Sequence, residues 1–318
     1  MTKPKVAFYW ASSCGGCEIA MLELGTDLVD VAKKADIVFW PAALDFKYSD
    51  VKSMADKSID VCFFNGAIQS SENEHMAELL RKKSKTLVAF GSCAYAGGIP
   101  ALANTTNQGQ LFVRVYKETP TTDNPESVLP QDSTQVKEGQ LTLPRLYDTV
   151  RTLDQTVDVD YYVPGCPPVG KQTWTVMKNL IGGNLPPKGS VIGASEKSLC
   201  DECKRAKGDR KIKKILRTYQ IVPDKDKCLL EQGIICMGPA TRGGCGTLCL
   251  DANMPCRGCY GPLPGVLDQG AKMLSALSSN FDADNEQEIE RISEGVVDPV
   301  GTFYRYSLAR SIMRRTKQ

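Results

Sequence analysis

The sequence predicts an α/β fold, in which helices cover both faces of a mostly parallel sheet. Short apolar runs alternate with helical patterns through the first half of the chain, and this alternation is typical of a parallel sheet buried on both faces. From about Ser190 the alternation stops, and a region rich in cysteine and glycine begins. We therefore expect a flavodoxin-like domain over residues 1–188 and an irregular C-terminal region over residues 189–318.

The apolar runs define the expected strands, and the patterns between them define the expected helices. The first run, at 6–10, reads Val-Ala-Phe-Tyr-Trp and leads into a loop of serine, cysteine and glycine. The four later runs lie at 35–40, 60–68, 85–90 and 157–163. Helical patterns fall between or after the runs, at 19–31, 49–57, 71–83 and 171–181.

Two segments depart from this rhythm. Between residues 104 and 143, threonine, glutamine, aspartate and proline dominate, which predicts a long surface insertion suited to an interface. The cysteine-rich region runs to Gly265, and an acidic tail with a helical pattern follows it.

Charge and composition exclude several classes of function. With 39 basic and 37 acidic residues among 318, the net charge of +2 creates no global field that would recruit nucleic acid. A hydrophobic share of 42% describes a folded chain, not a disordered one. The unusual feature is the presence of 13 cysteines beside a single histidine, His75. One histidine excludes any metal site built from several imidazoles.

The cysteines also bear on the compartment. The N-terminus has no pattern of a cleavable secretory signal, and no apolar run approaches the ~18–20 residues that span a membrane. We therefore expect a cytoplasmic protein with no membrane insertion, whose thiols stay reduced. Clustered cysteines in that setting usually bind metal, so all-cysteine zinc sites and iron–sulfur clusters are the candidates.

Four cysteines follow three of the expected strands. Cys14 and Cys17 come after the first apolar run, Cys93 after the fourth and Cys166 after the fifth. Because the loops after parallel strands gather at one edge of the sheet, we expect these four thiols to converge. The glycines that flank them permit close backbone approach, and a cluster needs amide groups directed at its sulfurs. Taken alone, Cys14 and Cys17 would also suit a thioredoxin-like redox pair.

Eight further cysteines lie in the second half. The one other cysteine, Cys62, lies in the first half, inside an apolar strand, and is expected to be a small buried hydrophobe. The remaining 13 − 1 = 12 cysteines fit three sets of four. The simplest division of the last eight follows the sequence, although an interleaved division stays open: Cys200, Cys203, Cys228 and Cys236, then Cys245, Cys249, Cys256 and Cys259.

Zinc is the alternative metal for these eight. Paired cysteines at this spacing often make structural zinc sites. The abundance of glycine and proline around them and the absence of hairpin knuckles favour iron–sulfur clusters instead. The compact cysteine run of a two-cluster ferredoxin is absent.

A basic stretch surrounds the first of these later cysteines. It has two interpretations: a solvated helix face, or a docking patch for an acidic electron-transfer partner. Three acidic residues oppose its nine basic ones, which are Lys197, Lys204, Arg205, Lys207, Arg210, Lys211, Lys213, Lys214 and Arg217.

Taken together, the motifs resemble those of the small subunits of [NiFe] hydrogenases. In the first half these motifs are Cys14-Gly-Gly-Cys17, Gly91-Ser-Cys93 and Pro164-Gly-Cys166-Pro-Pro168. The second half is similar to the methanogen-type, F420-non-reducing branch of the family, through Cys236-Met-Gly-Pro-Ala-Thr-Arg-Gly-Gly-Cys245, Met254-Pro-Cys256-Arg-Gly-Cys259-Tyr-Gly-Pro262 and Val297-Asp-Pro-Val-Gly-Thr-Phe-Tyr304.

The resemblance implies three [4Fe-4S] clusters. Cys14, Cys17, Cys93 and Cys166 would hold the proximal cluster, the set from Cys245 to Cys259 the medial one, and the set from Cys200 to Cys236 the distal one. Respiratory relatives usually supply a histidine where Cys200 stands here, and they often hold a three-iron medial cluster, whereas Cys249 offers a fourth thiolate. Both differences favour the cytoplasmic branch.

The resemblance also implies an electron relay with no bond-making residues of its own. A [NiFe] large subunit would oxidise H2, and electrons would leave towards an iron–sulfur adaptor and heterodisulfide reductase. Small subunits of F420-reducing hydrogenases and of sulfhydrogenases are close alternatives. A zinc-stapled interaction protein and a flavoprotein that holds FMN at the sheet edge are alternatives from other classes. The related subunit of complex I has adjacent cysteines, which this sequence lacks.

Overall fold

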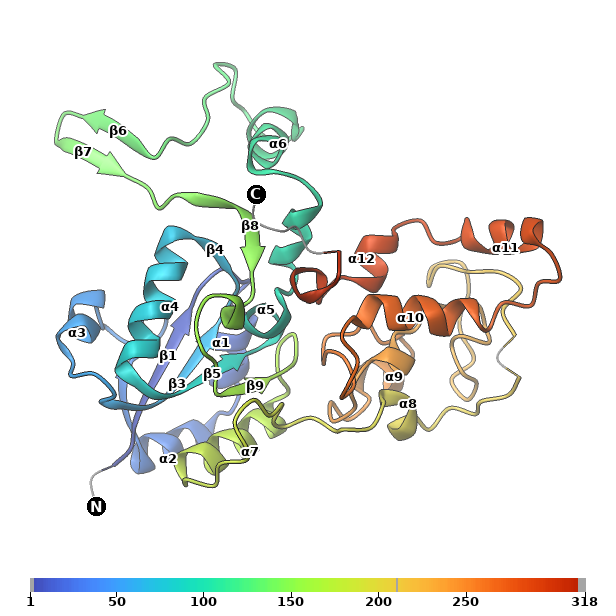
Figure 1. Cartoon of the computed structure of the whole chain (residues 1–318), viewed down its shortest axis with the longest axis horizontal. Helices are drawn as coiled ribbons and strands as arrows, with labels where there is room; N and C mark the ends of the chain where they lie inside the picture. The colour runs from blue at the N-terminus through green and yellow to red at the C-terminus, as the bar shows by residue number, and fades with distance from the viewer. Residues whose placement is uncertain (1–2, 210, 314–318) are drawn as a thin grey trace.

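The computed structural model describes residues 3–209 and 211–313. Figure 1 shows an α/β region on the left, an arm that leaves it at the top, and a C-terminal region of loops and short helices on the right. Within the described residues, no helix is both long enough and apolar enough to cross a membrane.

Five parallel strands form the central sheet in the order β2-β1-β3-β5-β9. Counted along the chain this is the order 2-1-3-4-5, the flavodoxin-like arrangement, so the predicted fold class is confirmed. The strands are β1 (Lys5–Trp10), β2 (Asp36–Phe39), β3 (Ile59–Asn65), β5 (Ser84–Phe90) and β9 (Tyr161–Val163).

One predicted strand is divided in the structure. The run at 60–68 forms β3, and the chain then turns at Gly66, whose φ is +101°. A Cβ there would lie 2.6 Å from the backbone carbon of Ala11, so only glycine fits the turn. The short β4 (Ile68–Ser70) follows and pairs antiparallel with β8 (Leu146–Arg151) outside the main sheet.

Alternation along the strands divides the core between the two faces of the sheet. On one face Phe8 and Phe63 stack at 5.3 Å between ring centroids, and α1 (Gly16–Leu22) and α7 (Gly170–Ile181) contribute to the same cluster. The opposite face includes Cys62 and is covered by α4 (Ser71–Lys83). Cys62 is fully buried there, as expected of a small hydrophobe, and burial raises the pKa of its thiol to about 12.

The predicted helices are present, and two of them differ from their predicted bounds. The helix α4 has the predicted bounds, and its N-cap Ser70 accepts a hydrogen bond from the Asn73 amide. The predicted helix at 19–31 is wrong as a single element, because the chain breaks at Gly25, where φ is +57°. It forms two helices, α1 and α2 (Thr26–Lys34). The predicted helix at 49–57 is shorter in the structure and forms α3 (Tyr48–Ser53). The predicted helix at 171–181 is present as α7.

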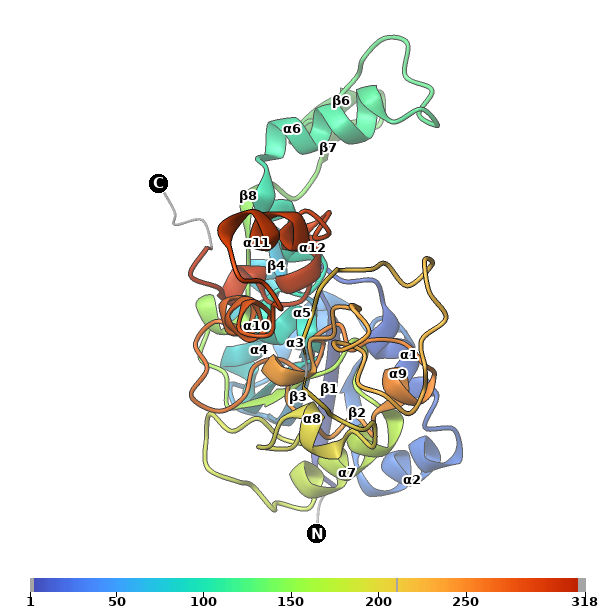
Figure 2. The ribbon, with the colours of Figure 1, turned by 90° about the vertical axis from the view of Figure 1, so that its right-hand side faces the viewer.

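The polar segment predicted as an insertion forms an arm that projects from the body (Figure 2). It carries α6 (Gln108–Val113) and a hairpin of β6 (Ser133–Val136) and β7 (Gly139–Thr142). Most of its side chains are exposed. Its suggested role at an interface stays a prediction.

The C-terminal region is built mainly of loops. Its hydrophobic cluster joins residues such as Leu230, Met273 and Phe303. The acidic tail is helical, as predicted. The helices of this region are α8 (Leu199–Glu202), α9 (Leu248–Asp251), α10 (Gln269–Ser278), α11 (Glu286–Ser293) and α12 (Pro299–Phe303). The sheet region contains one more short helix, α5 (Ser92–Ala96). Short 3₁₀ helices lie at Pro100–Thr105, Leu153–Gln155, Gly238–Ala240 and Leu308–Arg310, and a π-helical turn lies at Arg114–Glu118. The division of the chain at residues 188 and 189 stays a prediction.

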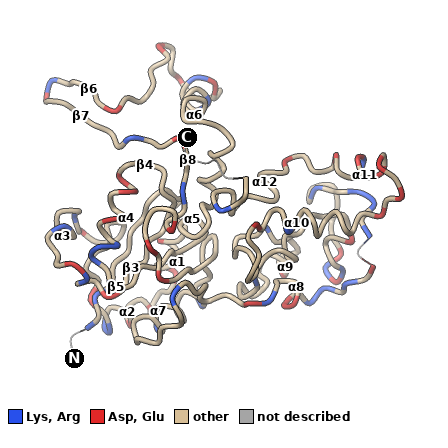
Figure 3. Tube along the Cα trace, in the orientation of Figure 1, with Lys and Arg blue, Asp and Glu red and all other residues tan. Residues whose placement is uncertain are grey.

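The basic stretch differs from its predicted form. Basic positions recur along the loop that follows α8 (Figure 3), but the described residues between 204 and 217 form no helix. Arg205 is buried, since its guanidinium donates to the carbonyl of Leu250 at 3.0 Å and to Asn253 Oδ1 at 2.7 Å. It therefore braces loops and cannot belong to a docking patch. Arg210 lies outside the described residues.

Asp160, just before β9, connects the edge of the sheet to neighbouring segments through its carboxylate. Its carboxylate accepts from Arg81 Nη1 and Lys188 Nζ, each at 2.6 Å, and from the Leu87 amide at 2.8 Å. Burial raises the pKa of Asp160, but the hydrogen bonds from Lys188 and Arg81 outweigh burial, and the pKa lies below its usual range.

The substitution Asp160→Asn should lower the free energy of unfolding by about 2 kcal/mol at neutral pH. Because the folded pKa is depressed, the stabilisation is present above the ordinary aspartate value and is lost as the pH falls through the folded value. The difference in the free energy of unfolding between wild type and variant should therefore become smaller below about pH 4. Urea denaturation followed by circular dichroism would measure it. The control is Asp158→Asn, which removes an exposed neighbouring carboxylate and should change the free energy of unfolding little. If the difference between wild type and Asp160→Asn did not depend on pH, the prediction would be wrong.

Candidate metal centres

The first four predicted cysteines meet at the carboxyl edge of the sheet. Cys14 follows β1, Cys17 lies in α1, Cys93 lies in α5 directly after β5, and Cys166 follows β9. The thiol of Cys17 interacts electrostatically with the other three, and that of Cys93 interacts with Cys166 and Cys14. The structure therefore brings this set together as the sequence predicts. We call it the edge set.

Burial and crowding disfavour ionisation of the Cys17 and Cys93 thiols. Burial and then the neighbouring thiols raise the pKa of Cys93 to about 12, and the same causes raise that of Cys17 further. Several thiolates at one buried point repel one another, so ionising them requires a positive charge among them. Bound iron supplies such a charge, and the donor set fits it.

Two glycines make room for the sulfurs of the edge set. A Cβ on Gly91, whose φ is +86°, would lie 2.4 Å from Cys17 Sγ. On Gly98 a Cβ would lie 2.5 Å from Cys93 Sγ. Any side chain at either position would displace a sulfur, which explains the glycines that flank the cysteines.

A second set forms around Cys259, and we call it the middle set. Cys259 interacts electrostatically with Cys245 and Cys249, and Cys256 interacts with Cys259. Burial is the first cause that raises the pKa of Cys259, to about 12. The amide of Gly258 donates to Cys256 Sγ at 3.4 Å, as an amide beside a thiolate would.

The third set surrounds Cys236, and we call it the outer set. Cys236 interacts electrostatically with Cys228 and Cys203. A Cβ on Gly238 would lie 3.1 Å from Cys200 Sγ and 3.6 Å from Cys236 Sγ, so these two sulfurs flank one point. Burial, chiefly, raises the pKa of Cys236 to about 11. Cys236 also interacts electrostatically with Cys256, more strongly than Cys259 does, so the sequential division of the last eight cysteines stays a prediction.

Direct contacts join the three sets in a row. The backbone amide of Cys166, in the edge set, donates to the sulfur of Cys259, in the middle set. Ser92 Oγ donates to the Cys259 carbonyl at 2.6 Å. On the other side, the Cys256 amide donates to Cys236 Sγ of the outer set at 3.4 Å. The middle set therefore lies between the other two.

Comparison with known proteins identifies the family. The model of the family described as "NADH ubiquinone oxidoreductase, 20 Kd subunit" matches residues 14–180. The iron-sulfur subunit of an F420-non-reducing hydrogenase from Archaeoglobus profundus is 41% identical, over 98% of each chain. An F420-non-reducing hydrogenase subunit from Methanothermobacter marburgensis is 35% identical, over 98% of this chain and 96% of the relative. The chain is a [NiFe] hydrogenase small subunit.

A solved structure agrees with this assignment. A chain of an NAD+-reducing [NiFe]-hydrogenase, in the H2-reduced state, is similar with a TM-score of 0.50 and 28% identity. The match covers 58% of this chain and 94% of that one. As a hydrogenase small subunit of the F420-non-reducing type, the chain is part of an oxidoreductase complex and pairs with a hydrogenase large subunit. None of the thirteen cysteines of this small subunit, all within the described residues, forms a disulfide. Within the described ranges, no three His, Cys, Asp or Glu side chains form a group that would hold a single metal ion.

Two residues near the edge set were not predicted from the sequence. Tyr306 hydrogen-bonds to the thiol of Cys166, and burial followed by nearby thiols raises the pKa of its phenol. Glu18 is buried beside Cys17 and accepts from Trp40 Nε1 and from Asn65 Nδ2. Burial raises the pKa of Glu18. A charged residue on a buried helix face was an available signal for Glu18, whereas nothing in the sequence spacing pointed to Tyr306.

Gly91→Ala should remove iron from the edge set, because the added Cβ would lie 2.4 Å from Cys17 Sγ. We expect the iron content to fall by about four atoms per chain, measured by iron analysis and EPR of the anaerobically purified protein. Gly183→Ala is the matched control, since Gly183 has a φ of +77° and nothing within 4 Å of the added Cβ. Equal iron loss in both variants would point to backbone strain instead of sulfur displacement.

Proposed function

We propose that the chain relays electrons from H2 oxidation through three [4Fe-4S] clusters, one held by each cysteine set. The observation that carries the proposal is the row of contacts from Cys166 to Cys259 and from Cys256 to Cys236. In this proposal the edge set is proximal, the middle set medial and the outer set distal. When bound, iron–sulfur clusters accept and release single electrons.

We infer that electrons enter at the edge set. Cys14 is the exposed member of the edge set, and it lines a shallow pocket with Trp10, Ile19 and Leu22. These three apolar side chains are 45%, 55% and 47% exposed. An exposed apolar patch beside a buried polar site is typical of a protein interface. We infer that the large subunit covers this patch, which would bring its reaction site close to the edge set.

The outer set is where electrons would leave. It lies in the loops of the C-terminal region and is joined to the edge set only through the middle set in the contacts described above. We propose that the electrons pass to an iron–sulfur adaptor and then to heterodisulfide reductase, as the resemblance to the F420-non-reducing branch implies. The all-thiol chemistry supports action in the cytoplasm, where thiols stay reduced.

Iron analysis of cysteine variants tests the three-cluster proposal. The anaerobically purified subunit should contain about twelve irons, and Cys93→Ser, Cys245→Ser and Cys228→Ser should each lower that number by up to about four. Cys62→Ser is the control, since this thiol is fully buried in the core and belongs to none of the sets. About four irons per chain in the wild type would contradict the proposal. Zinc in place of iron, with no visible absorbance, would support the alternative that the chain is an interaction protein stabilised by zinc sites.

Cys200→His tests the all-thiolate nature of the outer set. A thiolate adds negative charge relative to an imidazole, so replacing it should raise the reduction potential of the distal cluster. Redox titration followed by EPR would measure the change. The potential of the proximal cluster serves as the internal reference. A lowered or unmoved distal potential would show that the thiolate does not set it.

A further inference from the structure

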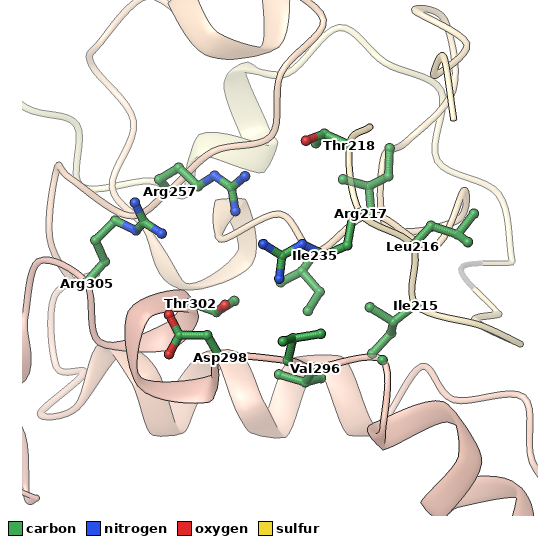
Figure 4. Close-up of a pocket in the computed structure, with 13 residues that line it drawn as sticks. Ile215, Leu216, Arg217, Thr218, Ile235, Arg257, Val296, Asp298, Thr302 and Arg305 are labelled. Atoms are coloured by element: carbon green, nitrogen blue, oxygen red, sulfur yellow. The ribbon is translucent and has the colours of Figure 1, made fainter. Parts of the chain in front are cut away.

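Three arginines converge on a cavity beside the outer set. The cavity, of about 80 Å³, lies between the loop at 215–218, Arg257 and the helix α12. Figure 4 shows the guanidinium groups of Arg217, Arg257 and Arg305 directed towards a common space, with Asp298 and Thr302 below them. None of these arginines is an iron ligand, although Arg257 stands between Cys256 and Cys259 of the middle set, so their convergence needs its own explanation.

These positive charges are poorly compensated. Within residues 3–209 and 211–313, the guanidiniums of Arg217 and Arg257 have no hydrogen-bond or ion-pair partner, and Arg305 donates only its Nε, to the Gly301 carbonyl at 2.8 Å. Asp298 is the carboxylate among the described lining residues, and its Oδ1 accepts from the Gly301 amide at 2.9 Å. Three cations therefore face one carboxylate that is already engaged.

The surroundings of the cavity strengthen the electrostatic interactions of these arginines. Arg257 and Arg305 are half-buried, so their guanidiniums are only partly solvated. Apolar side chains, including Ile215, Ile235 and Val296, form other walls of the cavity. Such walls strengthen both the repulsion among the arginines and their attraction for an anion.

We propose that the cavity binds a small tetrahedral oxyanion of the phosphate class, held by the guanidiniums of Arg217, Arg257 and Arg305. The planar guanidinium fork matches phosphate oxygens, and several such bonds are charge-assisted. A cavity of about 80 Å³ has room for a free oxyanion of this class.

The site has a consequence for electron transfer that rests on the proposed function. Arg257 lies within electrostatic range of Cys236, in the outer set. Without the oxyanion, the arginines raise the potential of a cluster held there, because they favour its more negative form. A bound dianion offsets them and should lower that potential.

Phosphate titration of the anaerobically purified hydrogenase complex tests the site. Calorimetry at constant ionic strength, with chloride as the background anion, should give one bound phosphate per chain. In Arg217→Gln/Arg305→Gln the affinity should fall at least about tenfold. Arg291→Gln is the matched control for the single variant Arg217→Gln, because it also removes one positive charge, but from α11, outside the cavity. Arg217→Gln alone, on an exposed side chain, serves if the double variant does not fold.

Each outcome decides the proposal. Anomalous density in selenate-soaked crystals between the three guanidiniums would support it, as would a distal potential that falls on phosphate addition in the wild type only. No phosphate binding in the wild type, or equal binding in the double variant, would overturn it. Loss of a partner subunit from the variants without any phosphate binding would also overturn it, and would assign the arginines to a protein contact. The iron content separates these results from a failure of the relay proposal, which would lower the iron count and leave phosphate binding intact.

Discussion

All parallel strands of a sheet end at the same edge, and the metal chemistry of this small subunit depends on that constraint. Cys14, Cys93 and Cys166 are far apart in sequence, yet each follows a strand of the same sheet. If β5 or β9 ran in the opposite direction, its cysteine would lie at the other edge, and no set of four thiols could form. The middle and outer sets depend on the same edge, because the Cys166 amide and the Ser92 hydroxyl contact Cys259 from there.

Electrostatics then explains why the surrounding protein has its composition. The crowded, buried thiols resist ionisation on their own, so bound iron and the fold stabilise each other. The loops that carry the later cysteines have little regular structure, and buried polar contacts replace it. Arg205 is the clearest case, with hydrogen bonds to two loops that are remote in sequence. Hydrogen bonds from amides and from a few buried charges therefore stabilise this region, which has little strand pairing.

The sequence was most informative where its periodicity is strong. The five strands, the helix α4 and the buried place of Cys62 could be predicted, because apolar alternation reports burial directly. The break at Gly25 could not, because the apolar pattern continues across α1 and α2 while a single positive φ ends the helix. Arg205 was misread as surface, since a run of basic residues does not show which member turns inward. Tyr306 and the three converging arginines depend on contacts between distant segments, and no local spacing reveals such contacts.

The hydrogen bond from Ser92 to the Cys259 carbonyl joins residues 167 positions apart. Closing a loop of that length costs more chain entropy than pairing neighbouring strands, and contacts of high sequence separation form slowly. We therefore expect the sheet to assemble first and to present a finished edge against which the later loops fold. Cluster insertion would then have a natural order along the chain, with the edge set complete before the middle set can be fixed against it.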